Sequence, residues 1–273
     1  MTLPAPASDR TCLVTGASSG IGAEMARVLA GRGFGVTLVA RTESRLRALA
    51  KELADRFAVR SEVIPVDLTD ESARAGIVRT LDDRGLKAHV LVNNAGFSTT
   101  GAVYRADPAR EVALVRTDVE AVVHLCALFT PGMVERRSGA ILNVASTAAF
   151  QPLPGQAAYG AAKAFVLSYS HALRGELRPH GVTVTALCPG PVETGFQDAA
   201  GFLEGEFEGA LPKFMWLPAT TVAKVAIDGL DANRAVVIPG LANRVGAAAG
   251  WLAPRSVIVS VTARRHPALS SNR

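Results

Sequence analysis

Short runs of mainly apolar residues recur along the chain, and longer stretches with helical spacing separate them. A run that is apolar at nearly every position predicts a strand buried on both faces, because a half-buried strand alternates apolar and polar residues. The runs predict strands at Thr11–Thr15, Val36–Ala40, Glu62–Val66, Val90–Val92, Ala140–Ala145, Thr183–Leu187 and Ala235–Ile238.

The stretches between these runs carry apolar residues at the spacing of amphipathic helices. Strands that alternate with helices form a parallel sheet, and right-handed crossovers place helices on both of its faces. We therefore predict one doubly wound α/β domain over residues 1–273, with a core at 9–240 and a sheet of about seven strands. The predicted helices are Ile21–Arg32, Glu43–Phe57, Glu71–Arg84, Ala109–Arg136, Ala158–Arg178 and Thr220–Gly229.

Two stretches depart from this alternation. Residues 191–217 are irregular and rich in Phe, Leu and Trp, which predicts a lid over a substrate pocket; the alternative is that these side chains pack on the body of the fold. The extension at 241–273 begins with an apolar stretch broken by Arg244, Pro254 and Arg255. It fits an extra helix that closes the pocket or a self-association surface better than a peripheral membrane contact.

Composition and charge exclude several classes of function. Apolar residues make up 49% of the chain, enough for a large core, and the net charge of +5 is scattered rather than gathered into a nucleic-acid-binding arm. Cys12, Cys126 and Cys188 are too far apart for a CxxC motif, so neither a disulfide framework nor a metal site is expected. Neither a signal peptide nor a membrane span is apparent, which predicts a cytoplasmic protein.

A glycine-rich turn follows the first predicted strand and leads into a helix. Gly16, Gly20 and Gly22 would let the backbone approach a pyrophosphate at the helix N-terminus. The second strand ends without a carboxylate and is followed by Arg41, which favours the 2′-phosphate of NADP(H) over NAD(H). NAD(H) stays open, because Arg41 could be an ordinary surface residue and Ser19 stands where a second basic residue would help.

Other polar or turn-forming segments follow the third, fourth and sixth predicted strands. The carboxyl ends of parallel strands lie on one edge of the sheet, where open α/β sheets bind ligands. Each segment taken alone could be mere turn chemistry. The segments are Asp67–Leu68, Asn93–Gly96 and Pro189–Thr194.

Tyr159 and Lys163 are four residues apart on a predicted helix, so they share one face. A phenol with a pKa of about 10 exchanges protons poorly near neutral pH, and a cation about 4 Å away would lower that pKa. Ser146 could hold a carbonyl oxygen beside the phenol. A Tyr and a Lys at this spacing are common by chance. The pair has a catalytic meaning only if the glycine turn and the segments after the other strands bind molecules with which Tyr159 can exchange a proton.

In their order and spacing, these motifs make the chain resemble the short-chain dehydrogenase/reductase family, in its compact single-domain form. The resemblance covers about residues 10 to 240 and implies a Rossmann-type fold. It rests on Thr15, Gly16, Gly20, Ile21, Gly22, Asp67, Asn93, Asn94, Ala95, Gly96, Ser146, Tyr159, Lys163, Pro189 and Gly190.

The resemblance implies roles for these residues. Tyr159 would be the catalytic acid/base, Lys163 would hold the nicotinamide ribose and lower the pKa of Tyr159, and Ser146 would bind the substrate oxygen. The glycine turn would hold the phosphates, and Thr194 would contact the carboxamide. The full cofactor-binding set is Gly16, Ser18, Ser19, Gly20, Ile21, Arg41, Asp67, Leu68, Asn93, Ala95, Gly96, Tyr159, Lys163, Pro189, Gly190, Val192 and Thr194.

Asp118 stands where the family usually has a catalytic asparagine. Asp has nearly the shape of Asn but adds a negative charge and lacks the amide donor. An ionised Asp118 near Lys163 would stabilise the ammonium and oppose the phenolate, or the proton relay could run through the carboxylate. The alternative is that the backbone carbonyl acts and the side chain only caps a local bend.

These observations predict an NADP(H)-dependent oxidoreductase that acts on an apolar ketone, aldehyde or secondary alcohol. The alternative is a non-catalytic NADP(H)-binding sensor or scaffold of the same fold. The resemblance also implies a homodimer or homotetramer built from the helices at 109–136 and 158–178.

Overall fold

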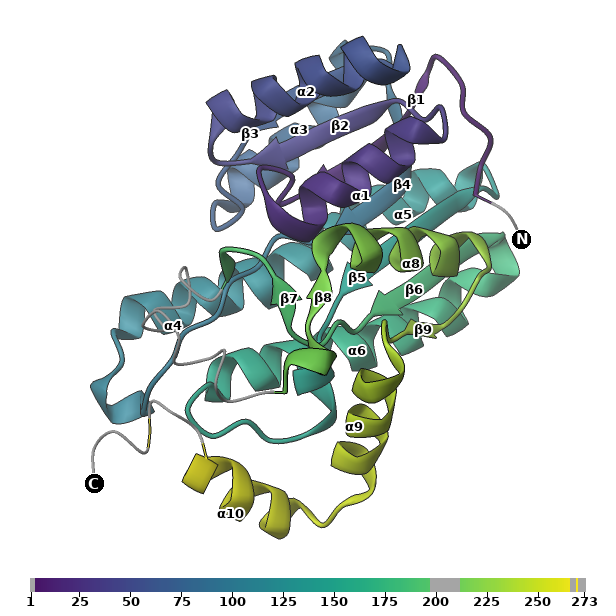
Figure 1. Cartoon of the computed structure of the whole chain (residues 1–273). Coiled ribbons are helices and arrows are strands. Elements are labelled where there is room, and N and C mark those ends of the chain that lie inside the picture. The colour runs from purple at the N-terminus through teal and green to yellow at the C-terminus, as the bar shows by residue number, and fades with distance from the viewer. Residues whose placement is uncertain (1–2, 197–211, 266–268, 270–273) are drawn as a thin grey trace.

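Seven parallel strands form the central sheet of the computed structural model, which describes residues 3–196, 212–265 and 269 (Figure 1). The strand order is β3-β2-β1-β4-β5-β6-β9, so the chain winds outward from β1 in one direction and then from β4 in the other. The strands are β1 (Arg10–Thr15), β2 (Val36–Ala40), β3 (Ser61–Pro65), β4 (Lys87–Asn93), β5 (Gly139–Val144), β6 (Val182–Leu187) and β9 (Val236–Val237).

Helices cover both faces of the sheet (Figure 1). Helices α1 (Gly20–Gly31), α2 (Glu43–Phe57) and α8 (Ala219–Asp231) pack on one face. The other face carries α3 (Glu71–Asp83), α5 (Ala121–Glu135) and α6 (Ala157–Leu177).

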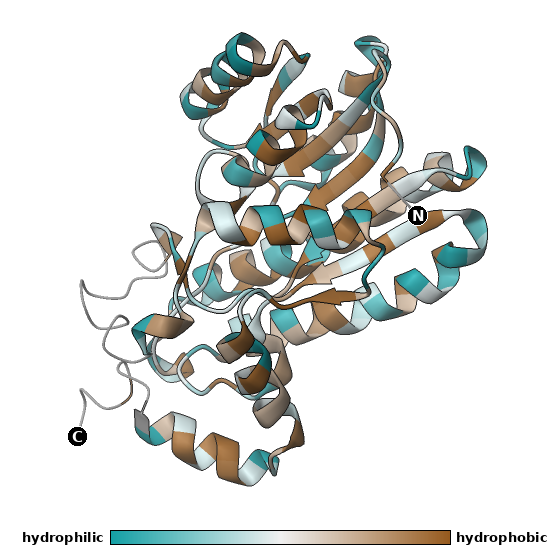
Figure 2. Cartoon of the chain, turned by 45° about the vertical axis from the view of Figure 1, so that its right-hand side comes forward, coloured by the Kyte–Doolittle hydropathy of each residue, from teal (hydrophilic) through white to brown (hydrophobic). Residues whose placement is uncertain are grey.

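The apolar strands supply both layers of the core. Adjacent residues of β1 show this, since Val14 packs into the layer beneath α1 while Leu13 packs into the layer beneath α6. Strands β2 and β6 are accordingly buried along their whole length, and the strands of the sheet are mostly hydrophobic in Figure 2. The predicted doubly wound parallel sheet is confirmed.

The long helix predicted at Ala109–Arg136 is interrupted. It consists of α4 (Pro108–Val115), a π-helical turn (Arg116–Glu120) and α5. The amide of Ala121 donates to the carbonyl of Arg116, five residues back, and this wider turn changes which side chains face inward. Asp118, inside the π turn, becomes fully buried.

The irregular stretch at 191–217 begins and ends in a small parallel pair, β7 (Val192–Glu193) and β8 (Leu217–Pro218). Most of the predicted lid, 197–211, lies outside the described residues, so the structure does not test it. The tail beyond β9 forms two helices, α9 (Leu241–Leu252) and α10 (Arg255–Arg265), at the lower end of the molecule in Figure 1.

Candidate active site

The hydroxyl of Thr15 ties the end of β1 to the end of β4. It donates to the carbonyl of Val92 (3.2 Å) and accepts from the amides of Asn94 (2.9 Å) and Ala95 (3.0 Å). The Asn94 amide group in turn donates to the carbonyl of Thr15 (2.9 Å). The Asn93–Gly96 segment is therefore fixed against the glycine turn, and Thr15 and Asn94 are positioning residues that the predicted site did not include.

Two positions of this turn, Gly16 and Gly22, require glycine. Gly16 has φ +65°, and a side chain there would strain the backbone. A Cβ on Gly22 would lie 2.4 Å from the Asn94 Nδ2 atom and 2.4 Å from the carbonyl oxygen of Gly16. The missing side chains leave the backbone free to approach a pyrophosphate at the N-terminus of α1, with Ser18 and Ser19 in the same turn.

The adenosine end of the predicted site lies beyond β2 and β3. Arg41 and Asp67 are both exposed. The backbone amide of Thr69 donates to the Asp67 carboxylate (2.9 Å), and this bond, together with the Thr69 hydroxyl and the charge of Arg41, holds the pKa of Asp67 below its usual range. Leu68, next to Asp67, is buried.

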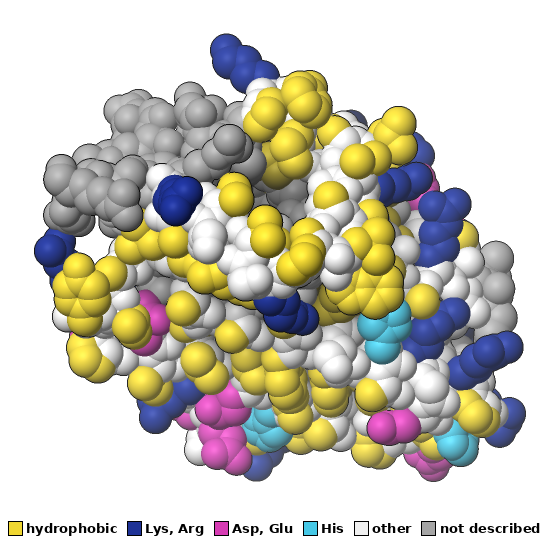
Figure 3. All heavy atoms as spheres, turned by 90° about the horizontal axis from the view of Figure 1, so that it is seen from below, with side chains coloured by type: hydrophobic (Ala, Val, Ile, Leu, Met, Phe, Trp, Pro, Cys, Tyr) yellow, Lys and Arg dark blue, Asp and Glu magenta, His cyan; other side chains and the backbone are white. Residues whose placement is uncertain are grey.

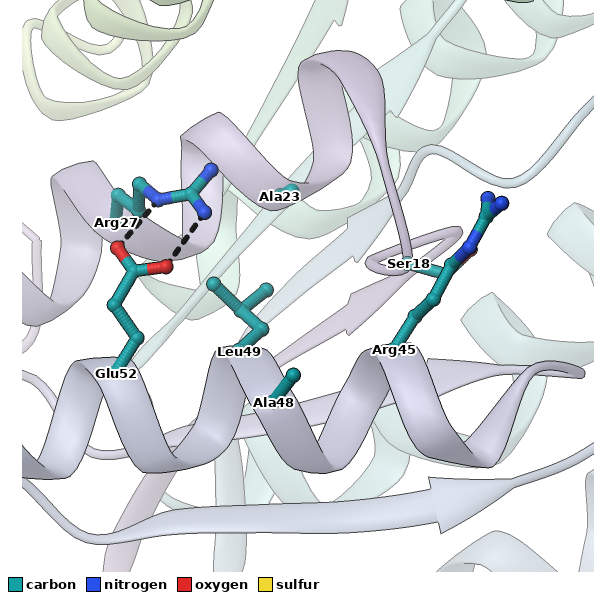
Figure 4. Close-up of a pocket in the computed structure, with 7 residues that line it drawn as sticks. All are labelled: Ser18, Ala23, Arg27, Arg45, Ala48, Leu49 and Glu52. Atoms are coloured by element: carbon teal, nitrogen blue, oxygen red, sulfur yellow. Dashed lines mark hydrogen bonds and ion pairs between the residues drawn. The ribbon is translucent and has the colours of Figure 1, made fainter.

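A shallow depression of about 230 Å³ lies between α1 and α2 (Figure 4). Ser18 of the glycine turn and Arg45 of α2 line one end, and Arg27 forms an ion pair with Glu52 (2.7 Å) at the other. The guanidinium of Arg45 points toward the glycine turn in Figure 4. Arg45, four residues after Arg41 in the chain, is thus a second basic side chain on this side of the glycine turn, and the predicted site did not include it.

The side chain of Asn93 is turned into the protein interior. Its amide donates to Asn143 Oδ1 (2.9 Å) on β5, and Asn143 donates to the hydroxyl of Ser170 (3.0 Å) on α6. These buried polar groups join β4, β5 and α6. Any contact of Asn93 with a ligand at the strand ends therefore runs through its backbone.

Three of the four predicted catalytic side chains, those of Ser146, Tyr159 and Lys163, meet at the carboxyl end of β5. Ser146 follows the strand and caps a short 3₁₀ turn (Thr147–Phe150), its hydroxyl accepting from the amide of Ala148 (3.1 Å). Tyr159 and Lys163 come from the first two turns of α6. The Lys163 Nζ atom lies 5.6 Å from the centre of the Tyr159 ring.

Lys163 is almost fully buried and has two oxygen partners. Its ammonium donates to the carbonyl of Val144 (3.1 Å) and forms an ion pair with the carboxylate of Asp118 (2.9 Å). The other Asp118 oxygen accepts from the amide of Phe97 (3.0 Å). A Cβ on Gly96 would lie 2.7 Å from the Asp118 Oδ2 atom, so glycine at 96 makes room for the carboxylate.

Burial and the neighbouring charges together shift the pKa values of Tyr159 and Lys163. Burial raises the pKa of Tyr159, and Lys163 and Ser146 only partly oppose the effect while Asp118 adds to it. Lys163 thus lowers the pKa of Tyr159 as predicted, but burial outweighs its charge, and the pKa of the phenol ends above its usual range. Burial lowers the pKa of Lys163, but the charges of Asp118 and Tyr159 outweigh this, and the pKa ends above its usual range.

The segment after β6 closes the other side of the site. Thr194 lies against the glycine turn, since a Cβ on Gly20 would be 3.3 Å from its methyl group. The carbonyl of Pro189 accepts from the amide of Thr147 (2.9 Å), and Val192 is buried. The rings of Phe196 and Tyr159 are 5.8 Å apart.

Gly190 is held against the tail of the chain. A Cβ there would lie 2.3 Å from Oδ1 of Asn243, a buried residue of α9 whose amide donates to the carbonyls of Met215 and Pro239 (3.1 Å each). Asn243 was not predicted, because nothing local in the sequence links residue 243 to the strand ends. Among the described residues, no cluster of His, Cys, Asp and Glu side chains could hold a metal ion.

Comparison with known proteins fits this arrangement. A family model described as short chain dehydrogenase matches residues 10–201. The chain is 37% identical to sulfoacetaldehyde reductase 2 of Chromohalobacter salexigens over 191 residues, which cover 67% of this chain and 73% of that protein.

Two solved structures are similar over most of their length. A short-chain dehydrogenase from Sphingobium yanoikuyae in complex with NADPH has 35% identity and a TM-score of 0.79, with 92% of this chain and 95% of that chain covered. A bulky-bulky ketone specific alcohol dehydrogenase from Comamonas testosteroni has 31% identity and a TM-score of 0.74, with 93% and 95% covered.

The chain therefore belongs to the short-chain dehydrogenase family, as its motifs predict. It is an oxidoreductase that acts on CH–OH and C=O groups.

Proposed function

We propose that this protein is an NADP(H)-dependent oxidoreductase that transfers a hydride between the nicotinamide and an apolar ketone, aldehyde or secondary alcohol. The observation that carries the proposal is the meeting of Ser146, Tyr159 and Lys163 at the carboxyl end of β5, beside the glycine turn. That edge of an open α/β sheet is where dinucleotides and their substrates bind.

The residues at this edge fit a dinucleotide. Gly16 and Gly22 leave the backbone open to the pyrophosphate, and Thr194 lies beside the same turn. When bound, the cofactor supplies or accepts the hydride. The other residues that would line it are Ser18, Ser19, Gly20, Ile21, Asp67, Leu68, Ala95, Gly96, Pro189, Gly190, Val192 and the backbone of Asn93.

NADP(H) is supported over NAD(H) by two basic side chains. Arg41 follows β2, and Arg45 lines the depression beside Ser18. Guanidinium groups bind phosphate through charge-assisted hydrogen bonds. The similar dehydrogenase from Sphingobium yanoikuyae was solved with NADPH, which agrees with this choice.

In the proposed reduction, Tyr159 donates its proton to the carbonyl oxygen, and Ser146 holds that oxygen in place. The raised pKa of Tyr159 keeps the phenol protonated at neutral pH, which suits the reducing direction. Lys163 lies behind the phenol, where its positive charge offsets the negative charge that forms on Tyr159. Asp118 holds Lys163 in position.

An apolar substrate is supported by the side chain next to the phenol. Phe196 packs against the ring of Tyr159, with the ring centres 5.8 Å apart. The similar Comamonas testosteroni alcohol dehydrogenase is bulky-bulky ketone specific, which agrees with a ketone as the substrate.

Loss of NADPH absorbance with a panel of apolar ketones and aldehydes tests the proposal, with charged aldehydes for comparison. We expect Tyr159→Phe to reduce kcat by roughly 100-fold or more, because general acid catalysis contributes about that much. Tyr169→Phe, on the same helix, is the matched control and should keep its activity. Cofactor binding without turnover in the wild type would instead indicate a non-catalytic sensor.

The cofactor preference has a separate test. Arg45→Gln should raise KM for NADPH about tenfold or more and leave KM for NADH unchanged, because a charge-assisted contact is worth roughly 1.5–3 kcal/mol. Arg47→Gln is the control, since Arg47 is on the same helix but pairs with Glu43 on the surface. Equal effects on both cofactors would exclude a 2′-phosphate contact for Arg45.

A further inference from the structure

Helix α9 presents its apolar face to the outside. Its packed face consists of Asn243, Ala247 and Gly250, at positions i, i+4 and i+7. Leu241, Val245 and Leu252 lie on the opposite side and are 75%, 62% and 79% exposed. A surface helix normally has the reverse arrangement, with its apolar stripe facing the core.

Helix α10 continues this apolar surface. Trp251, just before the bend between the two helices, is 72% exposed. Val257 and Val261, one turn apart on α10, are about half exposed, whereas Ile258 is buried. Figure 2 shows the hydrophobic turns of both helices, and Figure 3, viewed from below, shows hydrophobic side chains over much of this end, with Lys and Arg and some Asp and Glu side chains among them.

The charged side chains from residue 232 onward are all positive. From residue 232 to residue 273 there are six arginines and neither Asp nor Glu. Arg244 flanks the exposed stripe of α9, Arg255 begins α10, and Arg264 follows Val257 and Val261 along the same face. All three side chains are exposed. Within residues 232–273, the exposed apolar side chains are therefore accompanied along the chain by cations alone, and such a segment is complementary to a surface that is apolar inside and negatively charged at its edge.

We propose that this surface, formed by α9 and α10, docks on an anionic lipid bilayer. The exposed leucines, valines and Trp251 would enter the boundary between headgroups and acyl chains, while the arginines meet lipid phosphates and carboxylates. Trp is favoured at that boundary because its ring is apolar but carries one hydrogen-bond donor. The helices lie on the bilayer, since no described helix combines the length and hydropathy needed to cross one.

A second copy of this chain fits the surface less well. A twofold interface brings the same patch of both subunits together, so the arginines would face one another without acids from 232 onward to pair with. Like charges brought together in an interface oppose association. A negatively charged partner avoids that cost.

The docked surface would lie close to the active site. On its packed side, α9 contacts the segment after Ser146, since a Cβ on Gly250 would be 2.8 Å from Oε1 of Gln151. Asn243 meets Gly190, which follows β6. Docking would therefore hold the substrate side of the proposed site near the bilayer. The docking proposal itself does not depend on the proposed reaction, because it is tested by binding alone.

Co-sedimentation of the full chain with vesicles tests the proposal. We expect binding to phosphatidylcholine vesicles that contain phosphatidylserine, little binding to phosphatidylcholine alone, and release at high salt. Arg255→Gln with Arg264→Gln should weaken binding roughly 20-fold, at about fivefold for each arginine near the lipid surface. Arg79→Gln with Arg178→Gln removes two exposed arginines elsewhere and should leave binding unchanged.

Fluorescence of Trp251 provides a second measurement. Its emission should shift to the blue when anionic vesicles are added, and Trp251→Phe should abolish the shift while Trp216 remains as the other tryptophan. Equal binding to neutral and anionic vesicles, or no binding to either, would overturn the proposal. So would a dimer that dissociates in the Trp251→Ser, Leu252→Ser variant, because the occupant would then be a second copy.

Discussion

At the scale of single residues, the buried pair of Asp118 and Lys163 sets this site apart from the asparagine pattern that its family resemblance implies. Both side chains are nearly inaccessible to solvent, and a charge buried in this way is stable only when it is paired. Burial raises the pKa of Asp118, and Lys163 opposes that effect. The negative charge of Asp118 also raises the pKa of Tyr159, so it acts on the proposed proton donor from a distance.

Replacing Asp118 with Asn should therefore shift the pH dependence of kcat in one direction. Without the negative charge, the pKa of Tyr159 falls, and the phenol loses its proton at a lower pH. The alkaline decline of carbonyl reduction should shift to lower pH, and the onset of alcohol oxidation should shift in the same direction. The measurement is kcat against pH in both directions.

Glu135→Gln is the control for Asp118→Asn, because it removes an exposed carboxylate from the far end of the same helical segment. It should leave both profiles in place. If the alkaline limb of Asp118→Asn also stays where it is, the carboxylate has no electrostatic role, and the alternative of a local cap is correct.

At the scale of elements, Arg74 joins three segments that surround the site. It is a fully buried residue of α3, and its guanidinium donates to the carbonyl of Leu68, pairs with Glu120 in the π turn and donates to Nδ1 of His124 (3.1 Å) on α5. The π turn that carries Asp118 is thereby tied to the segment after β3. A single side chain thus links two segments that carry predicted site residues, Leu68 and Asp118.

Arg74→Met should lower the free energy of unfolding by about 2–4 kcal/mol, because the buried carbonyl of Leu68 loses its donor while Glu120, which is half exposed, can return to water. Urea denaturation measures this change. Arg79→Met, on the exposed side of the same helix, should change stability by less than about 0.5 kcal/mol. Similar values for the two variants would contradict a structural role for Arg74.

The elements that the sequence predicts best are those specified by local patterns. Strand ends, the glycine turn and the spacing of Tyr159 and Lys163 follow from apolar runs and turn residues, and the structure brings these segments together at the carboxyl edge of the sheet, where we propose the site. The π turn at Arg116–Glu120 was missed, because a change from i+4 to i+5 hydrogen bonding leaves the apolar spacing nearly unaltered.

Features that depend on tertiary packing could also not be predicted from the sequence. The pKa of Tyr159 is raised because the fold buries the phenol, and the spacing of Tyr159 and Lys163 in the sequence does not reveal that burial. The contact of Asn243 with Gly190 joins residues far apart in the chain, and Arg45 reaches the glycine turn from another helix. None of these has a local signature.

At the scale of the whole molecule, α4 and α6 carry a second group of exposed apolar side chains. Val112 and Val115 of α4 and Phe165 of α6 are about half exposed, and Phe165 stacks on Tyr169. Acids and bases are mixed along α4 and α6, in contrast to the tail. This surface, rather than α9 and α10, is therefore suited to pair with a second copy of itself.

We predict that Phe165→Glu dissociates the homo-oligomer that the family resemblance implies. A carboxylate at the centre of a twofold interface would face its own copy, and the cost of burying two unpaired charges exceeds the gain from the remaining apolar contacts. Light scattering coupled to size-exclusion chromatography measures the mass. Leu252→Glu on α9 is the matched control, and we expect it to remain oligomeric while losing vesicle binding. Dissociation by Leu252→Glu but not by Phe165→Glu would place self-association on the tail and would count against the lipid proposal as well.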